Sequence, residues 1–162
     1  MRRRTKLFAT ILVLGAIAVN GVALMHARAM CRFSNSGIRT EGPENVSMQR
    51  KLQILFTGIN MPRPTNASTP LDSGLSFEER SIQGPNGVLE AWLIQADDPV
   101  ATVVAFHGYS ASKEQLLALA APLSRLGCST LLVDFYGSGG SSGSSTTIGY
   151  REAEDGVNPI PS

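Results

Sequence analysis

The first 31 residues combine a short basic start with a long uncharged run. Basic side chains stand at Arg2, Arg3, Arg4 and Lys6, and residues 7–25 carry no charge. A helix needs about 20 apolar residues to cross a bilayer, whereas the apolar core of a cleaved signal peptide has about 7–15. The pattern therefore predicts an uncleaved signal anchor, a transmembrane segment over residues 1–31.

The basic start also predicts an orientation for this segment. Because basic residues stay on the cytoplasmic side, the chain is expected to be single-pass with its C-terminal part extracytoplasmic. One alternative remains open. Ala27-Arg28-Ala29 fits the small-x-small pattern of a cleavage site, and cleavage near Ala29 would give a secreted protein.

Residues 32–74 read as a juxtamembrane helix and linker. Ser47 is a suitable N-cap for a short helix over residues 48–57. Its apolar residues are clustered rather than evenly periodic, so the helix is expected to lie against the following domain or on the membrane surface. They are Leu52, Ile54, Leu55 and Phe56. The prolines of residues 61–70 predict an irregular segment.

From residue 75 the pattern changes to short apolar runs separated by turn residues. Residues 75–82 and 88–94 predict two strands, joined by a tight turn in which Asn86-Gly87 supplies positive φ angles. The continuous apolar run 101–106 predicts a strand buried on both faces. Residues 128–133 predict one more strand.

A helix is expected between the last two strands. Ser112 and Gln115 are spaced as a capping box, and leucines follow at helical intervals. Pro122 should kink or break this helix, and Gly127 should end it. The resulting order of hairpin, strand, helix and strand predicts an α/β fold, in which an antiparallel hairpin leads into a parallel sheet.

Two sequence motifs follow the last two predicted strands. His107-Gly108 ends the run 101–106, and Asp134-x-x-Gly137-x-Gly139-x-Ser141 follows the run 128–133. Over about residues 75–155, this arrangement resembles the front half of the α/β-hydrolase superfamily. It is similar to the serine-aminopeptidase and monoacylglycerol-lipase-like branch.

The resemblance implies a fold and departs from the family at one position. It implies a partial α/β-hydrolase sheet of about four strands with the first helix, placed after an N-terminal transmembrane helix. Many relatives have arginine where this chain has Tyr136. How the loop after the fourth strand is tied down is therefore in doubt.

The resemblance also implies a chemistry. In such hydrolases a serine attacks a carbonyl carbon, and two backbone N–H groups stabilise the oxyanion. His107, Gly108 and Tyr109 would form the oxyanion loop, with the Tyr109 N–H as donor and His107 shaping the loop rather than acting as the base. The implied substrate carries an ester, amide or acylglycerol-like bond. The alternative for these residues is a strand-to-helix turn without chemistry.

A literal Gly-x-Ser-x-Gly match makes Ser141 a candidate nucleophile, but its context argues against this role. The match lies in a Gly/Ser run over residues 137–145, and a loop rather than a helix follows it. The family order is serine, then an acid, then histidine. No histidine follows His107, and the other one, His26, lies in the predicted membrane segment. Asp134 is accordingly expected to be structural.

Composition limits the classes of binding partner that can be expected. A net charge of +1, with its one basic cluster at the N-terminus, gives no basis for nucleic-acid binding. The Gly-rich stretch lacks the Gly-Lys-Ser/Thr of a phosphate loop, and we expect no cofactor and no metal. The expected partners are a membrane, through residues 1–31, and a small ester, amide or lipid-like substrate if the protein is complete.

The C-terminal residues shape the functional hypothesis. Gly156 and two prolines should end the helix predicted over residues 150–155, so residues 156–162 are interpreted as an aberrant tail. The hydrolase-like domain over 75–155 would then stop before the nucleophile and the histidine, and the chain as given should be inactive. The run 101–106 would become an unpaired edge open to self-association. A non-catalytic, membrane-anchored pseudoenzyme or interaction module is the alternative.

Overall fold

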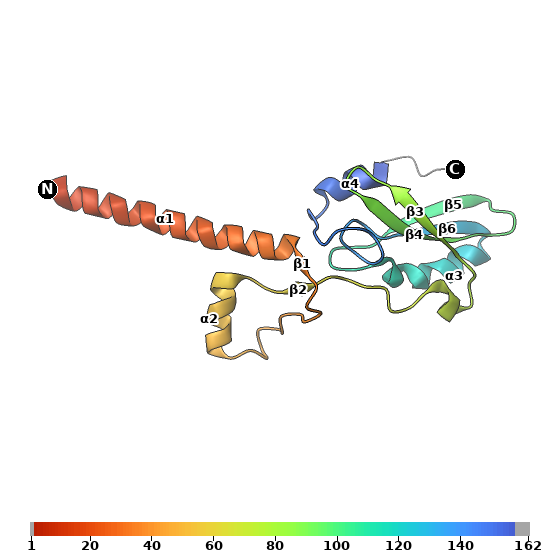
Figure 1. Ribbon diagram of the computed structural model, residues 1–162, viewed down its shortest axis with the longest axis horizontal. Helices are drawn as coiled ribbons and strands as arrows, with labels where there is room; N and C mark the ends of the chain where they lie inside the picture. Colours follow the sequence, from red (N-terminus) through yellow and green to blue (C-terminus); the bar gives the residue numbers. More distant parts are fainter. Residues whose placement is uncertain (1, 158–162) are drawn as a thin grey trace. The chain divides into compact units, whose positions relative to one another are not determined.

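The computed structural model describes residues 2–157, and the chain divides into two compact units. The first unit contains residues up to 32 together with 38–61. The second contains residues 33–37 and the chain from residue 62 onward. Figure 1 colours both units along the sequence.

The first unit contains two helices. Helix α1 (Arg2–Cys31) is long and apolar enough to cross a membrane. Helix α2 (Met48–Thr57) begins where the sequence predicts, because the Arg50 N–H donates to Ser47 Oγ over 3.3 Å. Capping one of the first free N–H groups in this way stabilises the start of a helix.

The apolar residues of α2 are more regular than the sequence suggested. Met48, Leu52, Leu55 and Phe56 follow the i, i+4, i+7, i+8 spacing of one helix face, and all are exposed. Ile54 lies off this face and is half-buried. The expectation of a merely clustered pattern left out Met48 and was wrong.

The linker is also more ordered than expected. Two short strands, β1 (Phe33–Ser34) and β2 (Met61–Pro62), form a two-stranded sheet. A 3₁₀ helix, η1, follows at Pro70–Ser73. Proline-rich composition predicts irregular backbone but gives no sign of pairing between segments so far apart in sequence.

The second unit is built on a four-stranded sheet with the order β3-β4-β6-β5. The strands are β3 (Glu78–Gln83), β4 (Val88–Ile94), β5 (Ala101–Phe106) and β6 (Cys128–Val133). The pairs β3–β4 and β4–β6 are antiparallel, whereas β5 and β6 are parallel and in register from Ala101↔Cys128 to Phe106↔Val133. The predicted hairpin leading into a parallel pair is confirmed.

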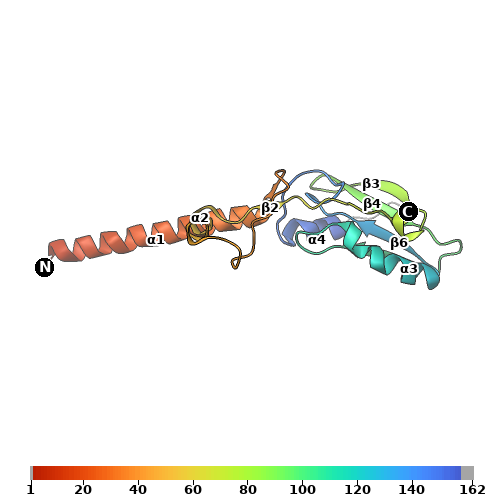
Figure 2. The same ribbon diagram turned by 90° about the horizontal axis from the view of Figure 1, so that it is seen from below.

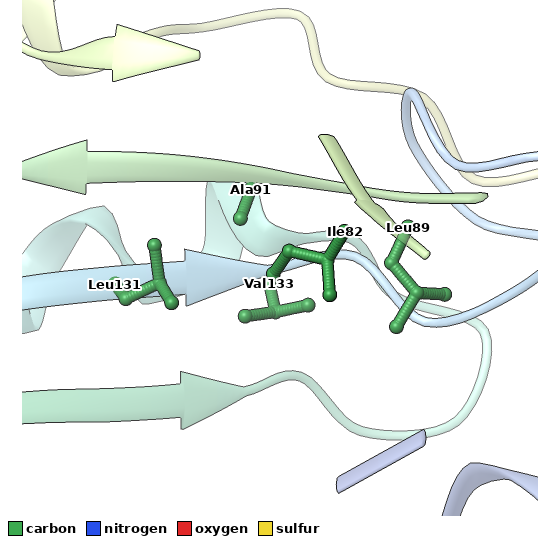
Figure 3. Packing of buried hydrophobic residues seen from close by; sticks show 5 residues of the cluster. All are labelled: Ile82, Leu89, Ala91, Leu131 and Val133. Atoms are coloured by element: carbon green, nitrogen blue, oxygen red, sulfur yellow. The ribbon is translucent and has the colours of Figure 1, made fainter. Parts of the chain in front are cut away.

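Each face of this sheet has its own core. Trp92, Ile94 and Leu132 pack with Ala120 of helix α3 (Leu117–Arg125), which lies along one face beside β6 (Figures 1 and 2). The opposite face carries a second cluster, shown in Figure 3. Its members are Ile82, Leu89, Ala91, Leu131 and Val133. Side chains alternate between the faces along each strand, so a single strand contributes to both clusters.

Strand β5 departs from one expectation and confirms another. The expected burial on both faces was wrong, because Ala101, Thr102 and Val104 are exposed and the other three residues are only half-buried. Among the described strands β5 stands at the edge of the sheet, as predicted. Beside it, a groove of about 710 Å³ runs over the open face, with Leu93, Val104 and Leu131 in its lining.

The connection between β5 and β6 differs in detail from the prediction. Ser112 makes no capping-box bond, because its hydroxyl donates to the Thr65 carbonyl over 3.2 Å. A 3₁₀ helix, η2 (Lys113–Leu116), comes first, and α3 then runs through Pro122 to Arg125, so of the expected kink or break at Pro122 the break does not occur. Gly127 follows the helix with a φ of 74°, which confirms its role in ending it.

The β3–β4 turn and the last helix also correct the sequence reading. In the turn only Gly87 has a positive φ, and the Gly84 N–H donates to the Gly87 carbonyl over 2.9 Å. Asn86 instead reaches helix α4 (Tyr150–Val157), where its side chain donates to Asp155 Oδ1 over 3.2 Å. The helix includes Gly156 rather than ending before it. The rest of the predicted tail, 158–162, lies outside the described residues.

Candidate functional site

The site lies where the two parallel strands end. Because β5 and β6 are in register, His107 and Asp134 leave the sheet side by side, and the loops that follow share one edge. In α/β sheets, ligands bind in the crevice outside the carboxyl ends of the strands. The motifs found in the sequence are therefore brought together at the position where this architecture places its chemistry.

His107 links the two loops. Its Nδ1–H donates to the Gly108 carbonyl over 2.8 Å, and its Nε2 accepts the Phe135 N–H over 3.1 Å. Burial lowers the pKa of His107, although the Gly108 carbonyl and the Asp134 carboxylate act in the opposite direction. The imidazole is thus neutral with both nitrogens engaged. This geometry fits a residue that shapes a loop and leaves no free nitrogen to accept a proton from a nucleophile.

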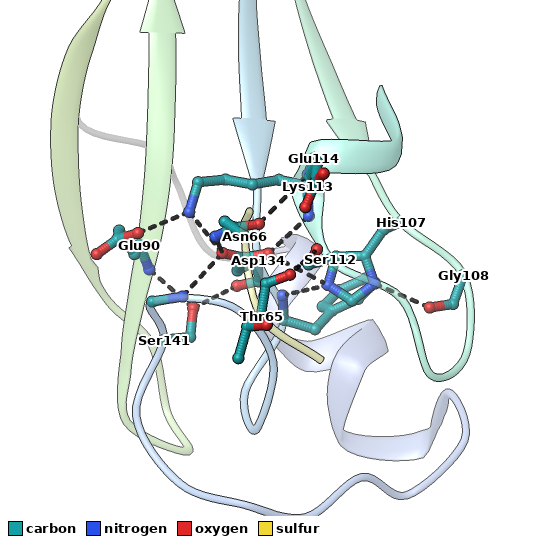
Figure 4. Close-up of polar contacts among 12 residues, drawn as sticks. Thr65, Asn66, Glu90, His107, Gly108, Ser112, Lys113, Glu114, Asp134 and Ser141 are labelled. Carbon is teal, nitrogen blue, oxygen red and sulfur yellow. Dashed lines mark hydrogen bonds and ion pairs between the residues drawn. The ribbon is translucent and has the colours of Figure 1, made fainter. Parts of the chain in front are cut away.

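A buried lysine lies at the centre of the site (Figure 4). Lys113 is fully buried, and its ammonium group donates to Asp134 Oδ2 over 2.5 Å and to Glu90 Oε1 over 2.7 Å. The same Nζ lies 4.3 Å from the centre of the Trp92 ring. A buried cation is tolerated only when it is paired and hydrogen-bonded. Lys113 therefore ties the turn after β5 to both β4 and β6.

Asp134 is the acceptor on which these contacts converge. Besides the Lys113 ammonium, it accepts the Lys113 N–H over 2.7 Å, the Asn66 side chain over 2.8 Å and the Gly140 N–H over 3.0 Å. Burial by itself would raise the pKa of Asp134, but the hydrogen bonds from Lys113 and Asn66 outweigh burial and hold that pKa below its usual range. The carboxylate stays ionised and joins three loops.

Sequence reasoning missed the partners of Asp134. In the printed sequence Lys113 looks like an ordinary charged residue in the first turn of a helix, and Asn66 lies in a proline-rich linker. The one available signal was Asp134 itself, because a buried aspartate at a strand end requires a donor or a cation nearby. Nothing local indicated which residue would provide it.

Ser141 is buried, and its hydroxyl is fully engaged. The Ser141 Oγ donates to the Asp134 carbonyl over 2.6 Å and accepts the Glu90 N–H over 2.8 Å. Only 3% of the residue is exposed. A serine nucleophile needs an accessible hydroxyl within reach of a base, whereas this hydroxyl joins β4 to the loop after β6.

The Gly-rich loop over residues 137–145 is held by an arginine from the linker. Arg63 donates to the Ser141 carbonyl over 2.5 Å and to the Gly143 carbonyl over 3.1 Å. Its own N–H donates to the Ser34 carbonyl over 2.9 Å. Tyr136, where many relatives place arginine, packs instead against the cluster on the open face. Arg63 therefore ties down this loop from a position 78 residues away in sequence.

A cavity of about 360 Å³ opens beside the His107–Tyr109 loop. Phe33, Tyr109, Ile148 and Glu152 are among the residues that line it. A Cβ atom added at Gly108 would meet no atom within 4 Å, and Gly108 does not have a positive φ. The side-chain position of Gly108 therefore faces open space beside this cavity.

Two residues that line this cavity have strained backbones. Ser110 has a φ of 54° and Ile148 a φ of 55°. A left-handed conformation is rare for non-glycine residues and costs most for a β-branched one. Such strain gathers at functional sites and persists only where neighbouring contacts enforce it.

Glu152 supplies those contacts on the far side of the cavity. Its carboxylate accepts hydrogen bonds from the Thr147 N–H and the Gly149 N–H, each over 2.9 Å, and from the hydroxyls of Thr146 and Thr147. Burial would raise the pKa of Glu152, but these bonds, led by the one from the Thr147 hydroxyl, lower it to about 2. Burial raises the pKa of Asp155, one turn further along α4, and its acidic neighbours raise it further, although the hydrogen bond from Asn86 acts in the opposite direction.

Replacing Glu152 by glutamine should therefore weaken the acid dependence of stability. A carboxylate whose pKa falls on folding contributes stability that is present above its ordinary pKa, near 4.5, and is lost as the pH falls toward about 2. Thermal unfolding of the full chain at a series of pH values, followed through the single tryptophan, Trp92, measures this. The Glu152→Gln chain should be less stable at pH 7 and should lose less stability between these pH values.

Glu154→Gln is the matched control, because Glu154 is an exposed carboxylate on the same helix. Its acid profile should follow the parent chain. Equal flattening in both variants would mean that the acid sensitivity does not come from the Glu152 contacts.

Among residues 2–157, no group of three or more His, Cys, Asp or Glu side chains is placed to hold a metal ion.

Comparison with known proteins identifies the fold. No protein-family model matches the chain, and no curated protein matches it significantly. An esterase from Pyrococcus furiosus, in two crystal forms, matches 59% of this chain with TM-scores of 0.52 and 0.51, at 27% and 25% sequence identity. The chain carries part of the α/β-hydrolase fold.

The matched region spans 38% and 39% of the two esterase chains. The chain thus spans well under half the length of that esterase. An α/β serine hydrolase homologue from Coxiella burnetii shares 30% identity over 48% of this chain and 40% of its own, with a TM-score of 0.40. The expected fold class, a partial α/β-hydrolase sheet behind a long apolar helix, is confirmed.

Proposed function

We propose that this chain is the N-terminal portion of a membrane-anchored serine hydrolase that cleaves an ester, amide or acylglycerol-like bond. The observation that carries the proposal is the His107–Tyr109 loop. It leaves the end of β5 beside a 360 Å³ cavity, at the carboxyl ends of the parallel strands. The structural similarity of 59% of the chain to an esterase supports this proposal.

In the proposed reaction this chain contributes electrostatic stabilisation. The Tyr109 N–H would donate to the oxyanion that forms when a serine attacks the substrate carbonyl carbon. Removing one such donor typically lowers kcat by about 100–1,000-fold. Such a donor must be held rigidly, and His107 and Lys113 fix the two ends of its loop through hydrogen bonds to residues after β6 and on β4.

The nucleophile and the base would have to come from elsewhere. The sequence has two histidines, His26 and His107. His26 lies in α1 with its Nε2–H bonded to the Leu55 carbonyl, and His107 has both nitrogens engaged. The chain of 162 residues is accordingly expected to be inactive by itself.

The anchor is the second part of the proposal. Helix α1 is 30 residues long, and none of its residues is buried. Its basic start favours a cytoplasmic N-terminus and an extracytoplasmic hydrolase unit. Membrane fractions resistant to extraction by carbonate, with the second unit open to added protease outside the membrane, would support this placement.

The adjacent DNA tests the catalytic proposal. Downstream sequence in any frame should encode Gly-x-Ser-x-Gly, then an acidic residue, then histidine. A product that joins this sequence to the present chain should hydrolyse p-nitrophenyl esters. If no such sequence exists, the alternative of a non-catalytic membrane-anchored module is favoured instead.

Ser141 should not react with a fluorophosphonate probe. Such probes label serines activated by a base, and the Ser141 hydroxyl is buried in two hydrogen bonds. The measurement is mass spectrometry of peptides from the probe-treated full chain, with an active α/β-hydrolase as the positive control. Labelling of the peptide that contains Ser141 would show instead that the chain is an active short hydrolase.

A further inference from the structure

One face of helix α2 is apolar and uncovered. This stripe is formed by Met48, Leu52, Leu55 and Phe56. Their exposed fractions are 71%, 53%, 52% and 57%, in that order. Apart from the half-buried Ile54, the rest of the helix is polar and carries Arg50 and Lys51. A helix only 10 residues long gains little stability in water without packing such a face.

Contacts within the first unit hold α2 at one end of α1. The His26 Nε2–H donates to the Leu55 carbonyl over 2.7 Å. Gly58, the C-cap of α2, lies so close to α1 that a Cβ atom there would come within 2.6 Å of the Ala29 Cβ. The uncharged run of α1 ends at Met25, which Gly58 also approaches, so α2 is attached at the end of the part that would occupy the hydrocarbon.

The direction of α2 relative to α1 also bears on how α2 would lie at a membrane. Both views show α2 running crosswise to α1 rather than alongside it (Figures 1 and 2). A helix crosswise to a membrane span, at the end of its apolar run, lies roughly parallel to the membrane surface. Such helices bury an apolar face in the boundary between headgroups and acyl chains and keep basic residues at the headgroups.

We infer that the stripe of α2 inserts into the surface of the same bilayer that α1 spans. The occupant is lipid, and this inference rests on the proposed membrane anchor. Cationic residues suit this position. Arg28 and Arg32 follow the apolar run of α1, and Arg50 and Lys51 lie on α2. The preferred surface would contain anionic phospholipid, to which each nearby basic residue adds attraction.

Single-cysteine labelling tests the inference in the full chain. Cys31 and Cys128 are both free thiols and are first replaced by serine. A cysteine is then placed at Leu52, on the stripe, or at Gln53, its neighbour on the polar side, and labelled with the fluorophore NBD. The chain is reconstituted in phosphatidylcholine vesicles containing a minority of phosphatidylglycerol, with and without doxyl-labelled lipid.

A cysteine at Ala16, in the middle of α1, reports on the anchor itself. The expected result is strong doxyl quenching at Ala16 and at Leu52, with quenching at Gln53 at least several-fold weaker. Quenching at Ala16 alone would overturn the inference while leaving the anchor in place. A blue-shifted but unquenched label at Leu52 would overturn it in favour of a protein-covered stripe, and loss of quenching at Ala16 would overturn both.

Discussion

Replacing Lys113 by methionine should lower the free energy of unfolding by about 3–5 kcal/mol, the range found when one partner of a buried ion pair is removed. The methionine would fill most of the space of the lysine stem. Asp134 and part of the Glu90 carboxylate would then face a site without a cation. The cost therefore comes from stranded negative charge more than from lost packing.

Trp92 is a convenient reporter of this change. It is the single tryptophan, it is 2% exposed, and the Lys113 ammonium lies 4.3 Å from its ring centre. Denaturant unfolding of the full chain, followed by Trp92 emission, should show a lower midpoint for Lys113→Met. The emission of the native state should shift as well, because the cation leaves the ring.

Arg80→Met provides the control with an exposed pair. Arg80 and Glu78 form an ion pair on β3 with 53% and 57% of their side chains exposed, and such pairs contribute about 0–1 kcal/mol. Its unfolding midpoint should stay near that of the parent. Comparable losses for Arg80→Met and Lys113→Met would contradict the central role given to the buried lysine.

A double-mutant cycle separates charge from packing. Combining Lys113→Met with Asp134→Asn removes the stranded charge, so the double variant should lose less stability than the sum of the single variants. A coupling of about 1–3 kcal/mol is expected for residues in one network. Strictly additive losses would mean that the two residues act independently.

Replacing Gly137 by alanine should also destabilise the second unit, by at least about 2 kcal/mol. Gly137 has a φ of 85°, and a left-handed residue with a Cβ atom costs about 1–2 kcal/mol. The added Cβ would in addition overlap the backbone of Ser145. Backbone cannot turn aside as a flexible side chain can, so the whole loop would have to shift.

Gly74→Ala separates the cost of the steric overlap at Gly137 from the cost of the left-handed conformation. Gly74 has a similar φ of 73°, but a Cβ atom there meets nothing within 4 Å. Its loss of stability should stay near the conformational cost of about 1–2 kcal/mol. The difference between the two variants, read from unfolding curves, measures the close approach of the chain at Gly137. Equal losses would refute that explanation.

The strands of this unit could be predicted because their signals are local. Residues 88–94, 101–106 and 128–133 are short, mostly apolar segments with turn residues nearby, and the structure places β4, β5 and β6 on these ranges. Pattern and turn residues act over a few positions, so they can be read directly from the sequence. The edge position of β5 was expected from the family resemblance rather than from the pattern.

The contacts that hold the site together could not be predicted in the same way. Lys113 meets Glu90 across 23 residues and Asp134 across 21, and Arg63 reaches Ser141 across 78. Each partner is an ordinary polar residue in its own neighbourhood. Ser112 shows the converse, because its local capping signal is present but Thr65, far away in sequence, takes the hydroxyl. Tertiary contacts override local preference where the chain folds back on itself.

The division of the chain between the two units has a consequence for the membrane anchor proposed above. Residues 33–37 belong to the second unit, the chain then leaves it for residues 38–61, and it returns at residue 62. Within the second unit the Phe33 N–H is bonded to the Ser144 carbonyl over 2.9 Å, and the Arg63 N–H to the Ser34 carbonyl. If α1 is the anchor, a protease that cuts within α2 would leave the second unit attached through these hydrogen bonds, whereas a cut near Ala29 would release the second unit with β1 still part of it.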